Sequence, residues 1–197
     1  MILEGIVTTL DAAGAINIAP MGPLVEPDFQ RFILRPFRGS NTYQNLARLG
    51  EGVLHVTDDV LLLARSAIGD AADAPSRPAE RVRGRILIDC CRYYEFRVTT
   101  TDASDERIRL GAETVCSGVV REFFGFNRAR HAVIELAILA TRIDFLDPVE
   151  VASELKKHRI IVEKTGGSRE TQAFQLLESH IQTVARRRGF DLDRGKP

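Results

Sequence analysis

Cysteine is scarce in this sequence of 197 residues, and its placement excludes two kinds of site. The three cysteines are Cys90, Cys91 and Cys116, and no Cys-x-x-Cys pair or Cys/His cluster accompanies them. An odd count with two adjacent thiols does not build a disulfide framework, and the spacing of zinc ligands is missing. We therefore expect reduced thiols in or near strands, and no metal site.

An excess of charge and long apolar runs are lacking as well. Lysine plus arginine number 27 and aspartate plus glutamate number 27, so the formal net charge is zero. No overall field then attracts nucleic acid or a membrane surface. The apolar runs, such as Val60–Ala64, are too short to cross a bilayer. The first ten residues lack the basic segment of a signal peptide. We expect a cytoplasmic protein that binds neither nucleic acid nor membranes.

Three common catalytic or nucleotide-binding motifs are missing. The sequence contains no GxGxxG fingerprint, no Walker-type loop and no GxSxG elbow. These absences argue against a dinucleotide-binding Rossmann domain, a P-loop enzyme and an α/β-hydrolase.

Residues 1–126 show the pattern of a β-rich domain. Short segments rich in β-branched and aromatic residues are separated by turn residues, which predicts a small barrel and argues against a parallel α/β sheet. Strands are predicted over Ile2–Leu10, Ile16–Ala19, Phe29–Phe37, Gly52–Thr57, Val82–Asp89, Tyr93–Thr101, Arg107–Leu110 and Thr114–Val120. Short helices are predicted over Thr42–Leu49, closed by Gly50, and over about 60–68. The segment Asp70–Glu80 has two prolines and no large apolar residue, so we expect a solvated loop or a mobile cover.

Residues 127–197 change to the 3.6-residue period of amphipathic helices. Asn127 is a predicted N-cap, and Asp147 followed by Pro148 predicts the start of a second helix. That helix is expected to end near Gly166 and Gly167, and Ser168 is expected to cap a third. Because each helix has one apolar face, we expect this segment to pack against the barrel.

The segment Arg35-Pro-Phe-Arg-Gly-Ser-Asn-Thr-Tyr-Gln-Asn-Leu46 is the most informative for function. A strand ends at Pro36 and a helix begins near Ser40 or Asn41, so unpaired N–H groups meet nearby hydroxyl and guanidinium donors. Such a set suits a terminal phosphate. The alternative is that Ser40 is only an N-cap and that the arginines are solvated.

Context comes from Asn17-Ile-Ala-Pro-Met-Gly22 and from Val56-Thr-Asp-Asp59. Together with the phosphate-site segment and Phe126-Asn-Arg-Ala-Arg-His-Ala-Val-Ile-Glu135, these motifs occur in an order that resembles a known family. It is a conserved archaeal-type flavoprotein family, a domain of unknown function within the FMN-binding split-barrel superfamily. The resemblance covers about two thirds of the chain. It implies a split barrel followed by a helical C-terminal segment, FMN as cofactor and a homodimer.

The resemblance also implies where FMN would lie, and it carries over no catalytic residue. Arg35, Ser40, Asn41 and Thr42 would hold the phosphate, while Asn17, Ala19 and Met21 would line the isoalloxazine, largely through backbone groups. Thr57 and Asp58 would lie along the neighbouring strand end. His55 precedes them on the same strand.

Two functions remain open from the sequence. The first is an FMN-dependent oxidoreductase that accepts a small substrate or reductant at the flavin. The second is a non-catalytic flavin-binding or electron-transfer module that acts through a protein partner. Because flavin carries its own redox chemistry, no conspicuous acid–base pair is required, and none is present. A mobile cover over residues 70–80 would favour the enzyme, which is the function we expect.

Overall fold

The computed structural model describes residues 1–192, which form two compact units. The first, here called the β unit, comprises residues 1–58 and 71–123. The second, here called the helical unit, comprises residues 59–70 and the chain from residue 124 onward. The short predicted helix near residue 60 therefore belongs with the C-terminal helices, although it lies within the β-rich part of the sequence.

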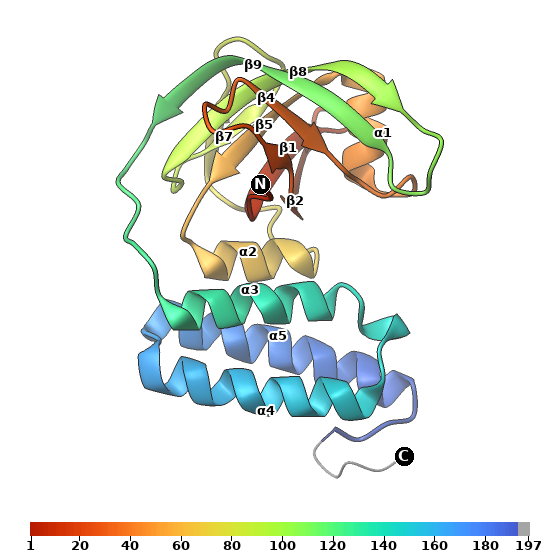
Figure 1. The fold of residues 1–197 in the computed structure, drawn as a ribbon, viewed down its shortest axis with the longest axis vertical. Helices are drawn as coiled ribbons and strands as arrows, with labels where there is room; N and C mark the ends of the chain where they lie inside the picture. Colours follow the sequence, from red (N-terminus) through yellow and green to blue (C-terminus); the bar gives the residue numbers. More distant parts are fainter. Residues whose placement is uncertain (193–197) are drawn as a thin grey trace. The chain divides into compact units, whose positions relative to one another are not determined.

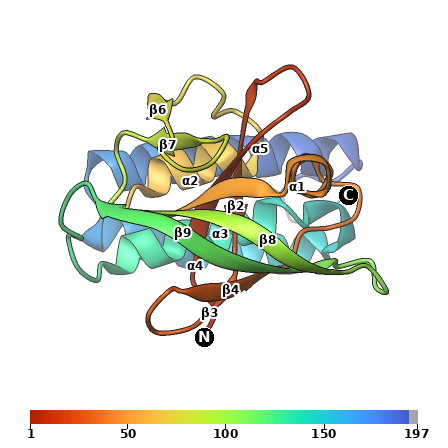
Figure 2. The same ribbon diagram turned by 90° about the horizontal axis from the view of Figure 1, so that it is seen from above.

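The β unit is built on one antiparallel sheet of seven strands (Figures 1 and 2). The strand order is β2-β1-β5-β8-β9-β4-β3. The bounds are β1 Gly5–Leu10, β2 Ile16–Met21, β3 Leu24–Val25, β4 Arg31–Leu34, β5 Glu51–Val56, β8 Arg92–Asp102 and β9 Arg109–Val119. A separate two-stranded sheet joins β6 Ser76–Pro78 to β7 Arg85–Leu87.

The N-terminal residues bring the sheet close to a closed barrel. Ile2 forms a bridge with Leu24 of β3, and the N–H of Val25 donates to the carbonyl of Met1 at 2.9 Å. Since β1 follows directly, one chain segment pairs with both ends of the strand order. The predicted split β-barrel is therefore confirmed, and its antiparallel sheet excludes a parallel α/β fold.

The interior of the barrel is apolar because alternate residues of each strand face it. Its buried residues are Val7, Val25, Phe32, Leu34, Leu46, Leu54, Tyr94, Phe96, Ile108, Leu110 and Ala112. Two aromatic pairs organise this core. Phe32 meets Phe96 edge-on with ring centroids 5.3 Å apart, and Phe29 stacks on Tyr94 at 4.6 Å. Leu46 comes from α1, Asn41–Leu49, the one described helix of this unit.

The helical unit packs four α-helices together (Figure 1). They are α2 Val60–Ala67, α3 Arg128–Ala140, α4 Pro148–Thr165 and α5 Ser168–Arg187, with a short 3₁₀ turn η1 at Ile143–Phe145. Each helix contributes one buried stripe, for example Ala173, Leu177 and Ile181 on α5. That this unit packs against the barrel stays a prediction.

The helix caps follow the sequence closely, with one exception. The Asn127 side chain accepts from the Arg130 N–H, and Asp147 accepts from the Val149 N–H at 2.7 Å. Ser168, however, is the first residue of α5 and not its cap. Gly167 takes the N-cap position, and its N–H donates to the Glu170 carboxylate at 2.9 Å.

Several strand predictions needed correction, and the predicted strand Val82–Asp89 is shortened to Arg85–Leu87. Phe29–Phe37 yields a strand only over Arg31–Leu34, because Phe29 lies in a turn with φ of 57°. The two strands predicted over 107–110 and 114–120 are one continuous strand, β9, which pairs through Gly111 and Ala112 with β4 and β8. Strand β2 runs on through Pro20 to Met21, which a strand at the edge of a sheet tolerates.

The segment 70–80 is also not the free loop that its composition suggested. Ser76–Pro78 pairs with Arg85–Leu87, and the Ile88 N–H donates to the Pro75 carbonyl at 3.0 Å. Ala71 and Ala74 are buried.

Candidate functional site

The start of α1 carries two backbone donors that are left unused. Ser40 is the N-cap: its hydroxyl accepts from the Tyr43 N–H at 3.2 Å and donates to the Phe37 carbonyl at 2.8 Å. The Gln44 N–H donates to the Ser40 carbonyl. Within the described chain, the N–H groups of Asn41 and Thr42 have no acceptor. These two donors lie at the positive end of the helix dipole, where an anion is stabilised.

Beneath this helix start lies a group of four side chains, Thr9, Asn17, Thr42 and Asn45, here called the amide–hydroxyl cluster. Asn17 Nδ2 donates to Thr42 Oγ1 at 3.1 Å and to Thr9 Oγ1 at 3.2 Å. Asn45 Nδ2 donates to Thr9 Oγ1 at 3.0 Å. Thr9, Thr42 and Asn45 are buried, whereas Asn17 is half-buried. The predicted residues Asn17 and Thr42 are thus in direct contact.

The register of β2 places the other predicted residues of that strand. Asn17, Ala19 and Met21 share one face and pair with Thr9, Val7 and Gly5 of β1. Asn17 lies at the α1 end of β2 and Met21 at the opposite end, where it packs against the barrel core. Since β2 is an edge of the sheet, the backbone groups on its outer side have no strand partner among residues 1–192.

Thr57 and Asp58 follow the end of β5, which flanks β1 on the side opposite β2. The register Ile6↔Pro20 and Ile6↔His55 puts this strand end level with the Met21 end of β2. The Asp58 carboxylate accepts from Arg121 Nη2 at 2.6 Å and is almost fully buried. Hydrogen bonds from Arg121 to Asp58 and then to Asp89 raise the pKa of Arg121. Asp58 is therefore tied to an arginine of its own unit.

The two arginines of the phosphate-site segment differ in what they contact. Arg38 donates through Nη2 to the Ala103 carbonyl and, at 3.4 Å, to that of Asp105, so it fastens the turn between β8 and β9. Arg35 makes one long contact, from Nη2 to the Gly22 carbonyl at 3.5 Å. Its Nε atom is buried and has no hydrogen-bond partner among the described residues. A buried unpaired donor is unfavourable unless a ligand satisfies it.

His55 is a structural residue of the β unit. Its ring is fully buried; Nδ1 lies 3.2 Å from the Ile6 carbonyl, and Nε2 accepts from the Leu87 N–H at 3.1 Å. These partners require a proton on Nδ1 and a lone pair on Nε2. Burial lowers the pKa of His55 to about 4. The neutral ring links β1, β5 and β7, and both of its nitrogens are engaged in these hydrogen bonds, so neither is available to a substrate.

The cysteines show no sign of reactivity. Cys90 and Cys91 are buried free thiols, and burial raises the pKa of Cys90 to about 11 and also raises that of Cys91. A thiol with a raised pKa is a poor nucleophile. Among residues 1–192, no group of three or more His, Cys, Asp or Glu side chains could hold a metal ion. No helix within that range has the length and apolar character needed to cross a membrane.

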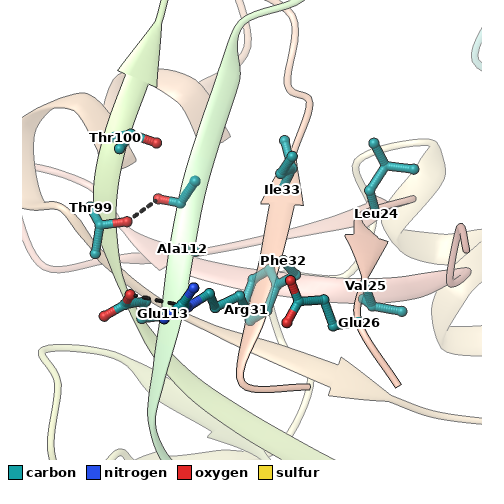
Figure 3. Close-up of a pocket in the computed structure, with 11 residues that line it drawn as sticks. Leu24, Val25, Glu26, Arg31, Phe32, Ile33, Thr99, Thr100, Ala112 and Glu113 are labelled. Carbon is teal, nitrogen blue, oxygen red and sulfur yellow. Dashed lines mark hydrogen bonds and ion pairs between the residues drawn. The ribbon is translucent and has the colours of Figure 1, made fainter. Parts of the chain in front are cut away.

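A shallow hollow of about 460 Å³ lies on another part of the sheet, across β3, β4, β9 and the bulge of β8 (Figure 3). Leu24 and Ile33 border it, Thr99 Oγ1 donates to the Gly111 carbonyl at 3.3 Å, and Arg31 pairs with Glu113 at 3.5 Å. None of the predicted site residues lines it. The unpaired donors at the start of α1 specify a ligand chemistry, whereas the hollow is open and two of its charged side chains, Arg31 and Glu113, pair with each other.

Sequence reasoning missed two members of the amide–hydroxyl cluster, Thr9 and Asn45. Asn45 stands in the phosphate-site segment three residues after Thr42, which places both on one face of α1. Thr9 precedes the turn between β1 and β2, so the pairing of a short hairpin could have put it opposite Asn17. The sequence positions of Thr9 and Asn45 are compatible with such a cluster, but only the observed β1–β2 register shows that Thr9 lies opposite Asn17.

Comparison with known proteins identifies the family. The chain matches the N-terminal domain model of the protein of unknown function DUF447 over residues 3–121, and the second DUF447 model over residues 127–179. An FMN-bound DUF447 protein of Methanosarcina mazei is similar over 91% of this chain and 94% of its own, with a TM-score of 0.81 and 22% identity.

Two further similarities cover smaller shares of this chain. An FMN-binding protein of Thermus thermophilus, solved with bound cyclohexenone, covers 61% of this chain and 72% of its own (TM-score 0.53, 12% identity). The 2-nitrobenzoate 2-nitroreductase of Pseudomonas fluorescens covers 58% and 63% (TM-score 0.51, 18% identity). At these identities the likeness shows a shared fold. The two matched models cover most of the chain, and the protein belongs to the DUF447 family.

Proposed function

We propose that this protein binds FMN in its β unit and uses it in an oxidoreductase reaction on a small substrate. The observation that carries the proposal is the start of α1, where two N–H groups and the proton of a threonine hydroxyl have no acceptor among the described residues. The FMN-bound family member from Methanosarcina mazei supports the choice of ligand. Bound FMN supplies hydride and single-electron transfer, so the chain needs only to bind and orient it.

The phosphate end of the site is assigned to the first turn of α1. The N–H groups of Asn41 and Thr42 and the Thr42 hydroxyl are donors of the kind that phosphate oxygens accept. The Ser40 hydroxyl is engaged as the helix cap, so Ser40 would act by shaping the turn. The Arg35 guanidinium contacts the Gly22 carbonyl next to Met21, and its Nε is buried and unpaired among the described residues; its assignment to the phosphate rests on the resemblance.

The ring end of the site is assigned to β2 beyond Asn17. Ala19 and Met21 follow at two-residue steps, and Met21 is about 13 Å along the strand from Asn17. Edge backbone groups of β2 suit the carbonyl and N–H groups of a flavin ring. Thr57 and Asp58 come level with Met21 by register. Asn17 was expected to line the isoalloxazine ring. Because its side chain forms a hydrogen bond with Thr42, we assign it to the phosphate end of the site.

The alternative is a non-catalytic electron-transfer module, and one observation favours it. The segment 70–80, expected as a mobile cover, is instead paired to β7 and partly buried. It therefore provides no argument for a closing substrate cleft. The named activity of a relative with the same fold, the nitroreductase, favours turnover. Multiple-turnover oxidation of a reduced nicotinamide dinucleotide by the FMN-loaded protein, with an added electron acceptor that reoxidises the flavin, would support the enzyme. Reduction of the bound FMN without turnover would support the module.

Cofactor binding is tested by the purified protein itself. We expect a flavin absorption spectrum, FMN by mass spectrometry of the released ligand, and tighter binding of FMN than of riboflavin by the apo protein. Thr42→Val should weaken FMN about tenfold and leave riboflavin nearly unchanged, since only FMN carries the phosphate. A folded protein without measurable FMN affinity would refute the proposal.

The two arginines provide a matched pair for the placement of the phosphate. Arg35→Ala should weaken FMN more than Arg38→Ala, because the Arg38 guanidinium already serves two carbonyls. Arg35→Lys should also weaken FMN, since lysine keeps the charge and loses the two-pronged geometry. Dissociation constants are compared at one ionic strength. A larger loss for Arg38→Ala would make Arg38 the anchor.

A homodimer and a cytoplasmic location complete the proposal. Both come from the sequence and its resemblance to split-barrel flavoproteins. Light scattering on the FMN-loaded protein would give the oligomeric state, and a monomer at micromolar concentration would contradict the dimer. We do not propose a nucleic-acid or membrane partner.

A further inference from the structure

We infer that Thr9 and Asn45 are positioning residues that orient the Thr42 hydroxyl toward the phosphate of bound FMN. This inference rests on the proposed function and deepens it. Neither residue has a predicted ligand contact, and both act through Asn17.

The geometry at Thr42 leaves its proton for a ligand. A hydroxyl has one proton to donate and two lone pairs with which to accept. Thr42 Oγ1 accepts from Asn17 Nδ2 at 3.1 Å, and within residues 1–192 no group accepts the Thr42 proton. The accepted bond limits the rotation of the hydroxyl. The proton is thereby available on the same residue whose N–H is also unused.

The position of Asn17 is in turn determined by Thr9. The two protons of Asn17 Nδ2 go to Thr42 and Thr9, so the amide is held at both sides. Thr9 Oγ1 also accepts from Asn45 Nδ2, and both of its lone pairs are then occupied. Asn45 lies one helical turn after Thr42 on the same face of α1. The hydrogen bonds Asn45–Thr9, Thr9–Asn17 and Asn17–Thr42 therefore connect Asn45 to Thr42 without a break.

The burial of the amide–hydroxyl cluster argues against a role in stability alone. Thr9 and Asn45 are buried in the same unit as the apolar core residues Val7 and Leu46. Replacing paired buried polar groups by apolar groups of the same shape is nearly neutral for stability. The cluster ends at the Thr42 hydroxyl, which lies beside the unpaired N–H groups of Asn41 and Thr42. An anionic ligand at this point would explain why the cluster is polar.

The test compares FMN with riboflavin, which lacks the phosphate. In the apo protein, Thr9→Val should weaken FMN about tenfold and change riboflavin less than twofold. Thr9→Ser retains the hydroxyl and should restore most of the FMN affinity. Asn45→Ala is the second variant, with the same expected change in the ratio of the two dissociation constants. It also keeps the test open if Thr9→Val fails to fold.

Thr8→Val is the matched control. Thr8 is equally buried and neighbours Thr9 on β1, but its hydroxyl donates to the Arg85 carbonyl at 2.6 Å and faces away from the cluster. It should leave the FMN-to-riboflavin ratio unchanged. If Thr42→Val raises the ratio of the FMN to the riboflavin dissociation constant while Thr9→Val and Asn45→Ala do not, the positioning role is refuted and the FMN site stands. If Thr42→Val also leaves the ratio unchanged, the proposed phosphate site fails, and the inference fails with it.

Discussion

Mild acid should destabilise the β unit through one residue, His55. Its ring is fully buried, and its Nε2 accepts from the Leu87 N–H at 3.1 Å, so a proton on Nε2 would face another donor. Burial lowers the pKa of His55 from 6.5 to about 4, and the bond to the Ile6 carbonyl opposes that shift only in part. The folded protein therefore resists a proton that the unfolded chain accepts.

The sign and size of the effect follow from linkage. Above pH 6.5 the ring is neutral in both states, and the stability that it provides is fully present. As the pH falls from 6.5 to about 4, the unfolded chain binds the proton first and the free energy of unfolding decreases. From the two pKa values the loss is about 2 kcal/mol at pH 5 and about 3 kcal/mol at pH 4. A loss of this size is a large fraction of the stability of a typical domain.

Urea unfolding of the apo protein at pH 7 and pH 5 measures the effect. The sequence has no tryptophan and three tyrosines, all in the β unit, so tyrosine fluorescence reports on that unit alone. In His55→Gln, which cannot titrate, the difference between the two pH values should be about 2 kcal/mol smaller than in the wild type. The exposed His131→Gln should behave as the wild type does. Equal pH dependence in wild type and His55→Gln would refute the reasoning.

Three further predictions concern packing and hydrogen bonding. Glu95→Gln should lower the stability of the β unit by about 1–3 kcal/mol, because the buried carboxylate accepts three backbone N–H groups of residues 80–82. The exposed Glu113→Gln serves as its control in urea unfolding. Gly52→Ala should cost about 1–3 kcal/mol, since its Cβ would lie 2.7 Å from a buried aromatic ring, whereas Gly39→Ala has open space. A chain that ends before α4 should aggregate in light scattering, because α4 and α5 bury apolar stripes within the helical unit. A truncated chain that stays soluble and keeps the thermal stability of the full chain would contradict this.

Local structure could be predicted wherever neighbouring residues decide it. The cap of α1 by Ser40, its left-handed end at Gly50 and the start of α4 at Asp147 all follow the sequence. In each case a side chain or a backbone N–H forms a hydrogen bond with a backbone group two to four residues away, so no distant partner is needed. The amphipathic period of the C-terminal helices is determined in the same way.

Tertiary structure decided which distant segments share a unit and which polar groups meet. Asp58 and Asp59 are adjacent in the sequence, yet Asp58 pairs with Arg121 in the β unit and Asp59 pairs with Arg169 in the helical unit. The α2 helix that follows them joins the C-terminal helices for the same reason: its partners lie about a hundred residues away.

In the candidate site, too, some features follow from the local sequence and others from the tertiary structure. The sequence by itself determined the donors at the start of α1, because a cap and a helix dipole are local properties. Its link to β2 was decided by the barrel, since Thr9 and Asn17 meet Thr42 and Asn45 only when the β1–β2 hairpin lies beneath α1. The same holds for His55, whose neutral, buried state depends on carbonyl and N–H partners 49 and 32 residues distant. Burial and hydrogen-bond partners at such separations are properties of the folded chain, and no local pattern encodes them.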